Sequence, residues 1–172
     1  MVEVNVARLG LDSATNSYVV ILRERGGRRL LPIWIGKPEA ESIVMEMNHL
    51  KRDRPLTHDL CKALIVGLGG ALRKVSITRI EKSTYFAEMQ IDGPQGIVQV
   101  DARPSDSIAI ALRLDAPIFA PESLLTAVEA DELDEDADET PFLAAASHEL
   151  SPEELKAYLE NLRPEDFGRF TP

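Results

Sequence analysis

The segment Asp101–Arg113, DARPSDSIAIALR, constrains the fold of this chain more than any other stretch. An alternating, β-branched run at 96–100 precedes it and predicts a strand, and Pro104 stands where the first residue of a helix would. The helix that follows is apolar on nearly every side, so it should be buried. A short strand predicted at 116–120 completes a strand–helix–strand unit. The polar turn before the helix is therefore expected at the rim of a buried core, where functional residues often collect.

Strands predominate in the rest of the chain up to residue 120. Alternating or β-branched runs bounded by turn residues predict them at 2–9, 17–22, 29–35, 71–80, 84–91 and 96–100. Apolar residues at helical spacing predict helices at 38–50 and 57–68, and a short helix is expected at 121–128. We therefore predict an α+β fold, a mixed and mostly antiparallel sheet of six to seven strands packed with three internal helices, plus a C-terminal helix.

The helix at 57–68 carries two specific expectations. Thr57 is a plausible N-cap, because its hydroxyl can accept a free backbone N–H. One apolar stripe then runs along the helix, through Leu60, Ala63, Leu64 and Leu68. Cys61, the single cysteine, lies in the same apolar pattern and is expected to be a buried structural thiol.

The acidity of the chain is concentrated in its last third. Residues 1–120 contain 16 Lys and Arg against 14 Asp and Glu, a net charge of +2, whereas residues 121–172 contain 3 against 15, a net charge of −12. We predict a domain at 1–128, a solvated acidic linker at 129–150 and a helical tail at 151–172. The tail helix opens with a capping box at Ser151–Glu154 and is marginal alone, so it should dock on its own core or on a second subunit of a homodimer.

The sequence also predicts where in the cell the protein is located. It has no apolar run long enough to span a bilayer, and its N-terminal residues lack the layout of a signal peptide. One cysteine cannot form a disulfide framework. We therefore expect a cytoplasmic protein that does not associate with a membrane.

No phosphate-binding glycine loop, paired-cysteine motif, HExxH or GxSxG occurs in the sequence. Among the remaining reactive side chains His58 is the strongest candidate for acid–base chemistry, because its ordinary pKa lies near neutrality. A histidine in the first turn of a helix is nevertheless more often a surface or capping residue. In the same way, Glu39 and Glu41 are explained as well by complementing the helix dipole as by a site.

Three separate blocks of the sequence resemble the signature blocks of the bifunctional nuclease (BFN) domain family. They are LPIWIGKPEAESI at 31–43, RPLTHDL at 54–60 and VDARPSDSIAIALR at 100–113, and the likeness extends over residues 2–128. Plant members of this family are described as degrading both RNA and DNA, so the resemblance implies a nuclease. By motif position, the implied site draws on Glu39, Glu41, Arg54, His58, Asp59, Arg103, Ser105 and Asp106.

A mechanism follows as a hypothesis. His58 serves as general base or acid, Asp59 orients it, and Arg103 and Arg54 hold the phosphate, with Ser105 as a further substrate contact. Asp106 with Glu39 or Glu41 would hold Mg²⁺ or Mn²⁺ in a metal-dependent version, because these ions favour oxygen ligands. The sequence does not choose between the metal-dependent and metal-free versions.

The competing interpretation is a non-enzymatic, oligomeric binding or regulatory module. In it Arg103 with Asp106, and Arg54 with Asp59, form buried ion pairs that tie each helix entry to the sheet. The nuclease mechanism requires in addition that the three polar helix entries converge on one site.

Overall fold

The computed structural model describes residues 1–12, 17–50 and 53–127. The chain divides into two compact units, Met1–Asp136 and Ala137–Pro172, and every described residue belongs to the first. The predicted acidic linker and tail helix lie outside the described residues.

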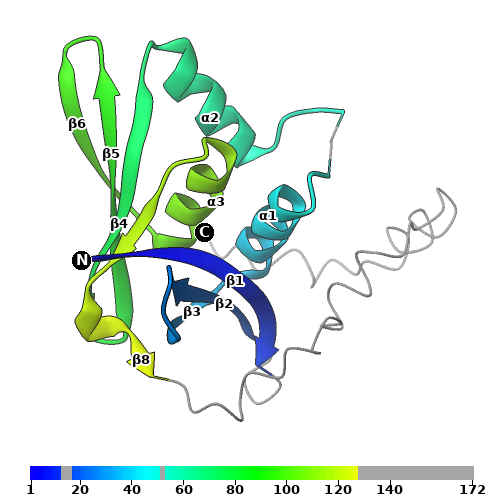
Figure 1. The fold of residues 1–172 in the computed structure, drawn as a ribbon. Helices are drawn as coiled ribbons and strands as arrows, with labels where there is room; N and C mark the ends of the chain where they lie inside the picture. Colours follow the sequence, from blue (N-terminus) through cyan, green and yellow to red (C-terminus); the bar gives the residue numbers. More distant parts are fainter. Residues whose placement is uncertain (13–16, 51–52, 128–172) are drawn as a thin grey trace, which may run out of the picture. The chain divides into compact units, whose positions relative to one another are not determined.

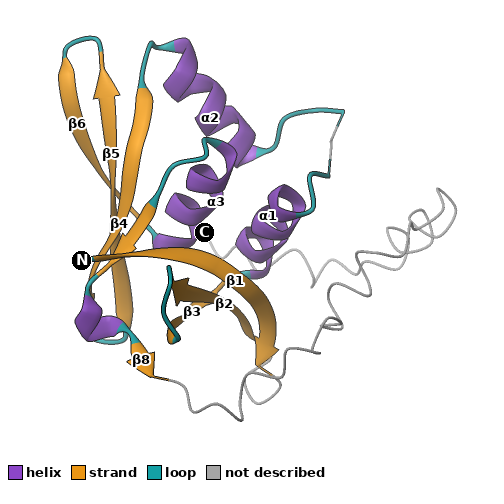
Figure 2. Cartoon of the chain, viewed as in Figure 1, coloured by secondary structure: helices purple, strands orange, loops and turns teal. Residues whose placement is uncertain are grey.

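The described part of the chain is an α+β fold built on one mixed sheet of eight strands (Figures 1 and 2). Their order across the sheet is β6-β5-β4-β7-β1-β2-β3-β8. The strands are β1 Val2–Asp12, β2 Ser17–Glu24, β3 Arg29–Ile35, β4 Ala71–Glu81, β5 Thr84–Gly93, β6 Gly96–Ala102, β7 Ile118–Ala120 and β8 Thr126–Ala127. Neighbours are antiparallel except β4 and β7, so the prediction of a mostly antiparallel mixed sheet is confirmed.

The three-residue strand β7 joins the two halves of the sheet. On one side it pairs in parallel with β4, where Val75 lies opposite Ile118. On the other side it pairs antiparallel with β1, where Val4 lies opposite the same Ile118. The predicted strand–helix–strand unit is therefore present, with β6 and β7 as its strands. The two are not neighbours in the sheet, because β5 and β4 lie between them.

Three helices gather on one side of the sheet, with α3 in contact with both α1 and α2 (Figure 2). They are α1 Lys37–Met47, α2 Thr57–Gly67 and α3 Pro104–Arg113. Eight of the ten residues of α3 are buried, which confirms the expectation from its apolar sequence. The apolar core is formed with the inward side chains of the strands, among them Val4, Val20, Leu22, Leu31, Ile33, Val75, Ile77 and Ala87.

Several local predictions were wrong. The segment after β7 forms a single 3₁₀ turn, Glu122–Leu124, followed by the short strand β8, because β8 pairs with β3 at the sheet edge. The N-cap of α2 is Leu56, so Thr57 is already helical. The apolar stripe of α2 faces solvent, with Leu60, Leu64 and Leu68 exposed by 52%, 53% and 75%. Cys61 is only partly buried.

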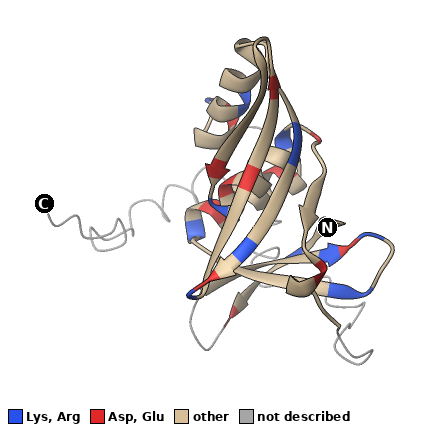
Figure 3. Cartoon of the chain, turned by 90° about the vertical axis from the view of Figure 1, so that its left-hand side faces the viewer, with Lys and Arg blue, Asp and Glu red and all other residues tan. Residues whose placement is uncertain are grey.

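The charges on the described surface are mixed. From the side shown in Figure 3, basic and acidic positions are interspersed along the strands. No helix of the part that the structure describes has the length and apolarity needed to cross a bilayer.

Candidate functional site

His58 is held by side chains from the other two helices. It lies in the first turn of α2 and is the one buried residue of that helix. Its Nδ1 is 2.7 Å from Oγ of Ser42 on α1, and its Nε2 is 3.1 Å from Oδ1 of Asp106 on α3. Both ring nitrogens are therefore engaged, and the orientation of the imidazole is fixed.

The tautomer of His58 follows from its partners. An ionised carboxylate only accepts hydrogen bonds, so Nε2 must donate to Asp106. In the neutral ring Nδ1 is then the acceptor, and the hydroxyl of Ser42 donates to it. Asp106 thereby fixes one tautomer and can stabilise the charged imidazolium, which is the role of a carboxylate next to a catalytic histidine.

Arg103, the N-cap residue of α3, extends this chain of polar contacts. Its Nε donates to Oδ2 of Asp106 at 2.8 Å, and its Nη2 donates to Oδ1 of Asp106 at 3.1 Å and to Oε1 of Glu39 at 2.8 Å. The Arg103 side chain is 66% exposed, whereas that of Glu39 is 15% exposed. The guanidinium thus lies at the surface above two carboxylates that are largely covered.

These contacts shift the pKa values of the pair. Partial burial of Asp106 favours its neutral form, but the hydrogen bonds from Arg103 and His58 outweigh burial and lower its pKa. The Asp106 carboxylate, acting first through its hydrogen bonds, raises the pKa of Arg103. Asp106 is therefore ionised near neutral pH, in the state that holds His58 in one tautomer.

The polar ends of the three helices meet at one cleft of about 620 Å³. It lies where α1, the segment before α2, and the start of α3 approach one another. Its chemically active lining residues are Glu39, Glu41, Ser42, His58, Arg103 and Asp106. The convergence that the proposed nuclease mechanism requires is present in the fold.

Asp59 does not orient His58. Its carboxylate accepts the backbone N–H of Leu56 at 2.9 Å and the Nε of Arg113 at 2.6 Å. The hydrogen bond from Arg113 is the main reason that the pKa of Asp59 is lowered. The carboxylate in contact with the His58 ring is that of Asp106, because Nε2 points toward α3.

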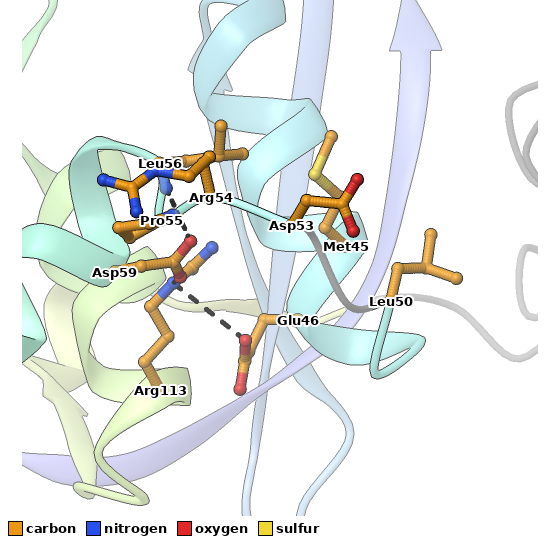
Figure 4. A pocket seen from close by; sticks show the side chains of 9 residues that line it. All are labelled: Met45, Glu46, Leu50, Asp53, Arg54, Pro55, Leu56, Asp59 and Arg113. Atoms are coloured by element: carbon orange, nitrogen blue, oxygen red, sulfur yellow. Dashed lines mark hydrogen bonds and ion pairs between the residues drawn. The ribbon is translucent and has the colours of Figure 1, made fainter.

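Arg113 closes a second cluster beside the first (Figure 4). Its side chain is only 2% exposed, and it also donates to the carbonyls of Ala109 at 2.9 Å and Ser42 at 3.3 Å. Arg54 shares the adjacent cavity of about 400 Å³, but no ion pair joins it to Asp59. The pair expected between Arg54 and Asp59 is therefore replaced by Arg113 with Asp59.

Of the remaining candidates, Glu41 lines the His58 cleft and Ser105 does not. Ser105 is buried and lines a separate, smaller cleft. Glu41 is half-buried and pairs with Lys37 at 3.9 Å. No side chain caps the start of α3 by a hydrogen bond.

The residues proposed for Mg²⁺ or Mn²⁺ do not assemble into a metal site. Within the described ranges, no three His, Cys, Asp or Glu side chains are grouped so that they could hold a metal ion. The physical reason lies with Arg103, whose cationic guanidinium is bonded to both Glu39 and Asp106. We derive no step through a metal.

Two residues of the site, Ser42 and Arg113, were not found from the sequence. Arg113 did carry a signal, because a long cation in the last turn of a helix that is buried all round must have a partner inside the fold. Ser42 carried none, since small polar residues are common in helices of any exposure.

Comparison with known proteins gives matches over most of the chain. A model of the bifunctional nuclease domain matches residues 20–132. An uncharacterised protein of Mycobacterium tuberculosis (strain ATCC 25618 / H37Rv) is 39% identical over 170 residues, which cover 97% of this chain and 98% of that protein.

Plant proteins match over a shorter region. Bifunctional nuclease 1 of Oryza sativa subsp. indica is 28% identical over 110 residues, and bifunctional nuclease 2 of Arabidopsis thaliana is 31% identical over 108 residues. These regions cover 62% and 61% of this chain but only 33% of each plant protein.

Proposed function

The chain belongs to the bifunctional nuclease domain family, and on that premise we propose that it is a nuclease that hydrolyses phosphodiester bonds of RNA, DNA or both with little sequence specificity. One observation carries the proposal: a buried histidine, oriented by an ionised carboxylate, lies in an open cleft beside an exposed guanidinium. The family match alone would not name the reacting groups.

The chemistry assigns one task to each side chain. Nδ1 is the basic nitrogen of His58, because the proton on Nε2 stays with Asp106. When the Ser42 hydroxyl turns away from Nδ1, that nitrogen takes a proton from the attacking water and returns one to the leaving oxygen, while Asp106 stabilises the imidazolium formed in between. Arg103 binds the phosphate and offsets the charge that develops on its oxygens. Its Nη1 has no hydrogen-bond partner among the described residues, which leaves two N–H donors for phosphate oxygens.

Substrate binding requires some exchange of partners in this scheme. A phosphate that reaches Arg103 competes with Glu39 and Asp106 for the guanidinium, and the side chain is exposed enough to move. His58 stays in place during this exchange because its Nε2 keeps the hydrogen bond to Asp106. Ser42 positions the ring in the free protein, and its hydroxyl leaves Nδ1 when the attacking water donates there.

The test is cleavage of labelled single-stranded RNA and DNA by the purified full chain, with EDTA, Mg²⁺ or Mn²⁺ in parallel. Replacing His58→Ala or Asp106→Asn should lower the rate by about 10²–10⁴-fold, the usual contribution of general acid–base catalysis. Asp92→Asn is the matched control, since Asp92 is a carboxylate in an exposed ion pair with Arg73. Activity that survives in both site variants, as a contaminant's would, overturns the proposal.

A non-enzymatic binding or regulatory module is the second candidate. It is favoured by the complete pairing of the site: in the described residues, no buried side-chain nitrogen or oxygen lacks a hydrogen-bond partner. A double-mutant cycle on Arg103 and Asp106 separates the two candidates. Strong coupling in the free energy of unfolding without any cleavage activity supports the module, and loss of cleavage in folded variants supports the nuclease.

A further inference from the structure

A smaller cleft of about 240 Å³ lies on the other side of Arg103. Its walls come from the end of β3, the turn between β4 and β5, and the start of α3. The residues that line it include two aromatic ones, three with aliphatic hydroxyls and one arginine: Trp34, Tyr85, Ser83, Thr84, Ser105 and Arg103. Arg103 lines this cleft and the His58 cleft, so the two adjoin at its side chain.

Trp34 is placed as a binding residue would be. Its side chain is on β3, and the residue is 53% exposed although it is the largest apolar side chain of the protein. The indole N–H donates to Oδ2 of Asp12 at 3.2 Å. This hydrogen bond lies in the plane of the ring, so it anchors the indole by its edge and leaves the ring faces for stacking.

The two clefts differ in charge. The His58 cleft contains the carboxylates of Glu39, Glu41 and Asp106, whereas none of the residues that line the Trp34 cleft is acidic. A polyanion bound at Arg103 therefore meets less repulsion on the Trp34 side. The groups there are rings and hydroxyls, which stack on and hydrogen-bond to nucleobases.

We propose that the cleft lined by Trp34 and Tyr85 is a nucleobase-stacking subsite, which holds the base next to the phosphate bound at Arg103. The inference rests on the proposed function, and it assigns a substrate class to it: single-stranded nucleic acid. A base in a duplex is already stacked and paired, so it cannot enter the cleft without unpairing. Stacking tolerates any base, which agrees with little sequence specificity.

The protein carries its own reporter for this subsite. Trp34 is the one tryptophan of the chain, so tryptophan emission reports on this ring alone. The full-length His58→Ala variant, which should not cut its ligand, is titrated with a short oligothymidylate, the same strand in a duplex, and inorganic phosphate. We expect quenching by the single strand and none by the duplex or by phosphate.

Substitutions then test whether the second ring, that of Tyr85, contributes to the affinity for the single strand. Tyr85→Leu should weaken binding of the single strand about tenfold, as expected for the loss of one stacking contact, whereas Tyr85→Phe should bind as before. Trp34→Leu should have a similar effect, measured by anisotropy of a labelled strand. Ile97→Ala, at an exposed apolar residue of β6, is the matched control and should change nothing.

The outcomes separate this inference from the nuclease proposal. If the wild-type protein cleaves single strands but Trp34 is not quenched, or if Tyr85→Leu binds normally, the subsite is wrong and the nuclease stands. If the duplex quenches equally, single-strand selectivity is wrong. If Trp34 is quenched by single strands alone and nothing is cleaved, the subsite stands and the nuclease proposal fails.

Discussion

Arg103 and Arg113, at the two ends of α3, have the same charge and opposite surroundings. The Arg103 side chain is 66% exposed, and that of Arg113 is 2% exposed. An exposed guanidinium can leave its partners for a phosphate, but a buried one cannot be left unpaired without a large cost. We therefore assign Arg103 to the substrate and Arg113 to the stability of the fold.

This distinction predicts the effect of removing the partner of Arg113. Asp59→Asn should lower the free energy of unfolding by about 3 kcal/mol, because it leaves a buried cation without its closest counter-charge. Asp92→Asn, in the exposed pair with Arg73, should cost no more than about 1 kcal/mol. Urea unfolding of the two variants checks this, and equal losses would contradict it.

The lowered pKa values of Asp59 and Asp106 predict a dependence of stability on pH. A carboxyl whose pKa is lower in the folded state stabilises the fold fully above its unfolded pKa of about 3.9, and this contribution is lost as the pH falls through the folded value. We expect the free energy of unfolding to fall in acid, and less steeply in an Asp59→Asn, Asp106→Asn double variant. An unchanged slope in the double variant would count against these shifts.

At this scale the sequence predicted which residues lie near one another better than which of them pair. The family resemblance grouped His58, Arg103 and Asp106 by motif position, and the fold brings them to one cleft. The sequence could not predict that Asp106 rather than Asp59 contacts His58, since the choice depends on how α2 rotates against α3. Adjacent residues of a helix point in different directions, and only packing decides which one meets a given neighbour.

Among the elements, the turn between β4 and β5 lies under strain. Glu81 pairs with Thr84, so the loop contains only Lys82 and Ser83, with φ of 47° and 63°. Two-residue hairpin loops with both φ positive favour Asn followed by Gly. The same loop carries Ser83 into the Trp34 cleft.

Relief of this strain is measurable. The double substitution Lys82→Asn, Ser83→Gly should raise the free energy of unfolding by about 1 kcal/mol. This figure already deducts the cost of the higher entropy that glycine gives the unfolded chain. Gly96→Ala is the opposing control, because Gly96 has a φ of 117° that alanine rarely adopts. In thermal unfolding, the melting temperature should rise in the loop variant and fall in Gly96→Ala. A higher melting temperature in Gly96→Ala would refute the reasoning.

Helix α2 shows where periodicity stops being informative. The spacing of its leucines correctly predicted a helix with one apolar face, and the apolar α3 was correctly predicted to be buried. Periodicity does not say what covers an apolar face, and the face of α2 is exposed. The strands were the easier elements, because turn residues delimit most of them, and only the two-residue β8 escaped notice.

For the whole molecule, the exposed apolar side chains predict self-association. Leu60 and Leu64 of α2 and its C-cap residue Leu68 are exposed by 52%, 53% and 75%. Apolar surface of this kind is typical of an interface. The homodimer expected from the sequence remains a prediction, and this face is where we expect it to form.

The double substitution Leu64→Glu, Leu68→Glu should convert the expected dimer to a monomer, because a dimer would then bury two unpaired charges in each subunit. Sedimentation velocity measures this change. Lys62→Glu, on the same helix, adds negative charge without removing an apolar side chain, and should leave the dimer intact. A wild-type protein that sediments as a monomer would dismiss the prediction.

The position of β7 has a consequence for how the protein is made. Strand β1 is synthesised first, yet one of its neighbours in the sheet is Ile118–Ala120, which leaves the ribosome more than a hundred residues later. Without β7, the strands β1–β2–β3 and β4–β5–β6 share no pairing, and β1 and β4 each have an unpaired edge that invites wrong pairing. Because three late residues close both edges at once, we expect the nascent chain to be exposed to wrong pairing until Ile118–Ala120 have been made.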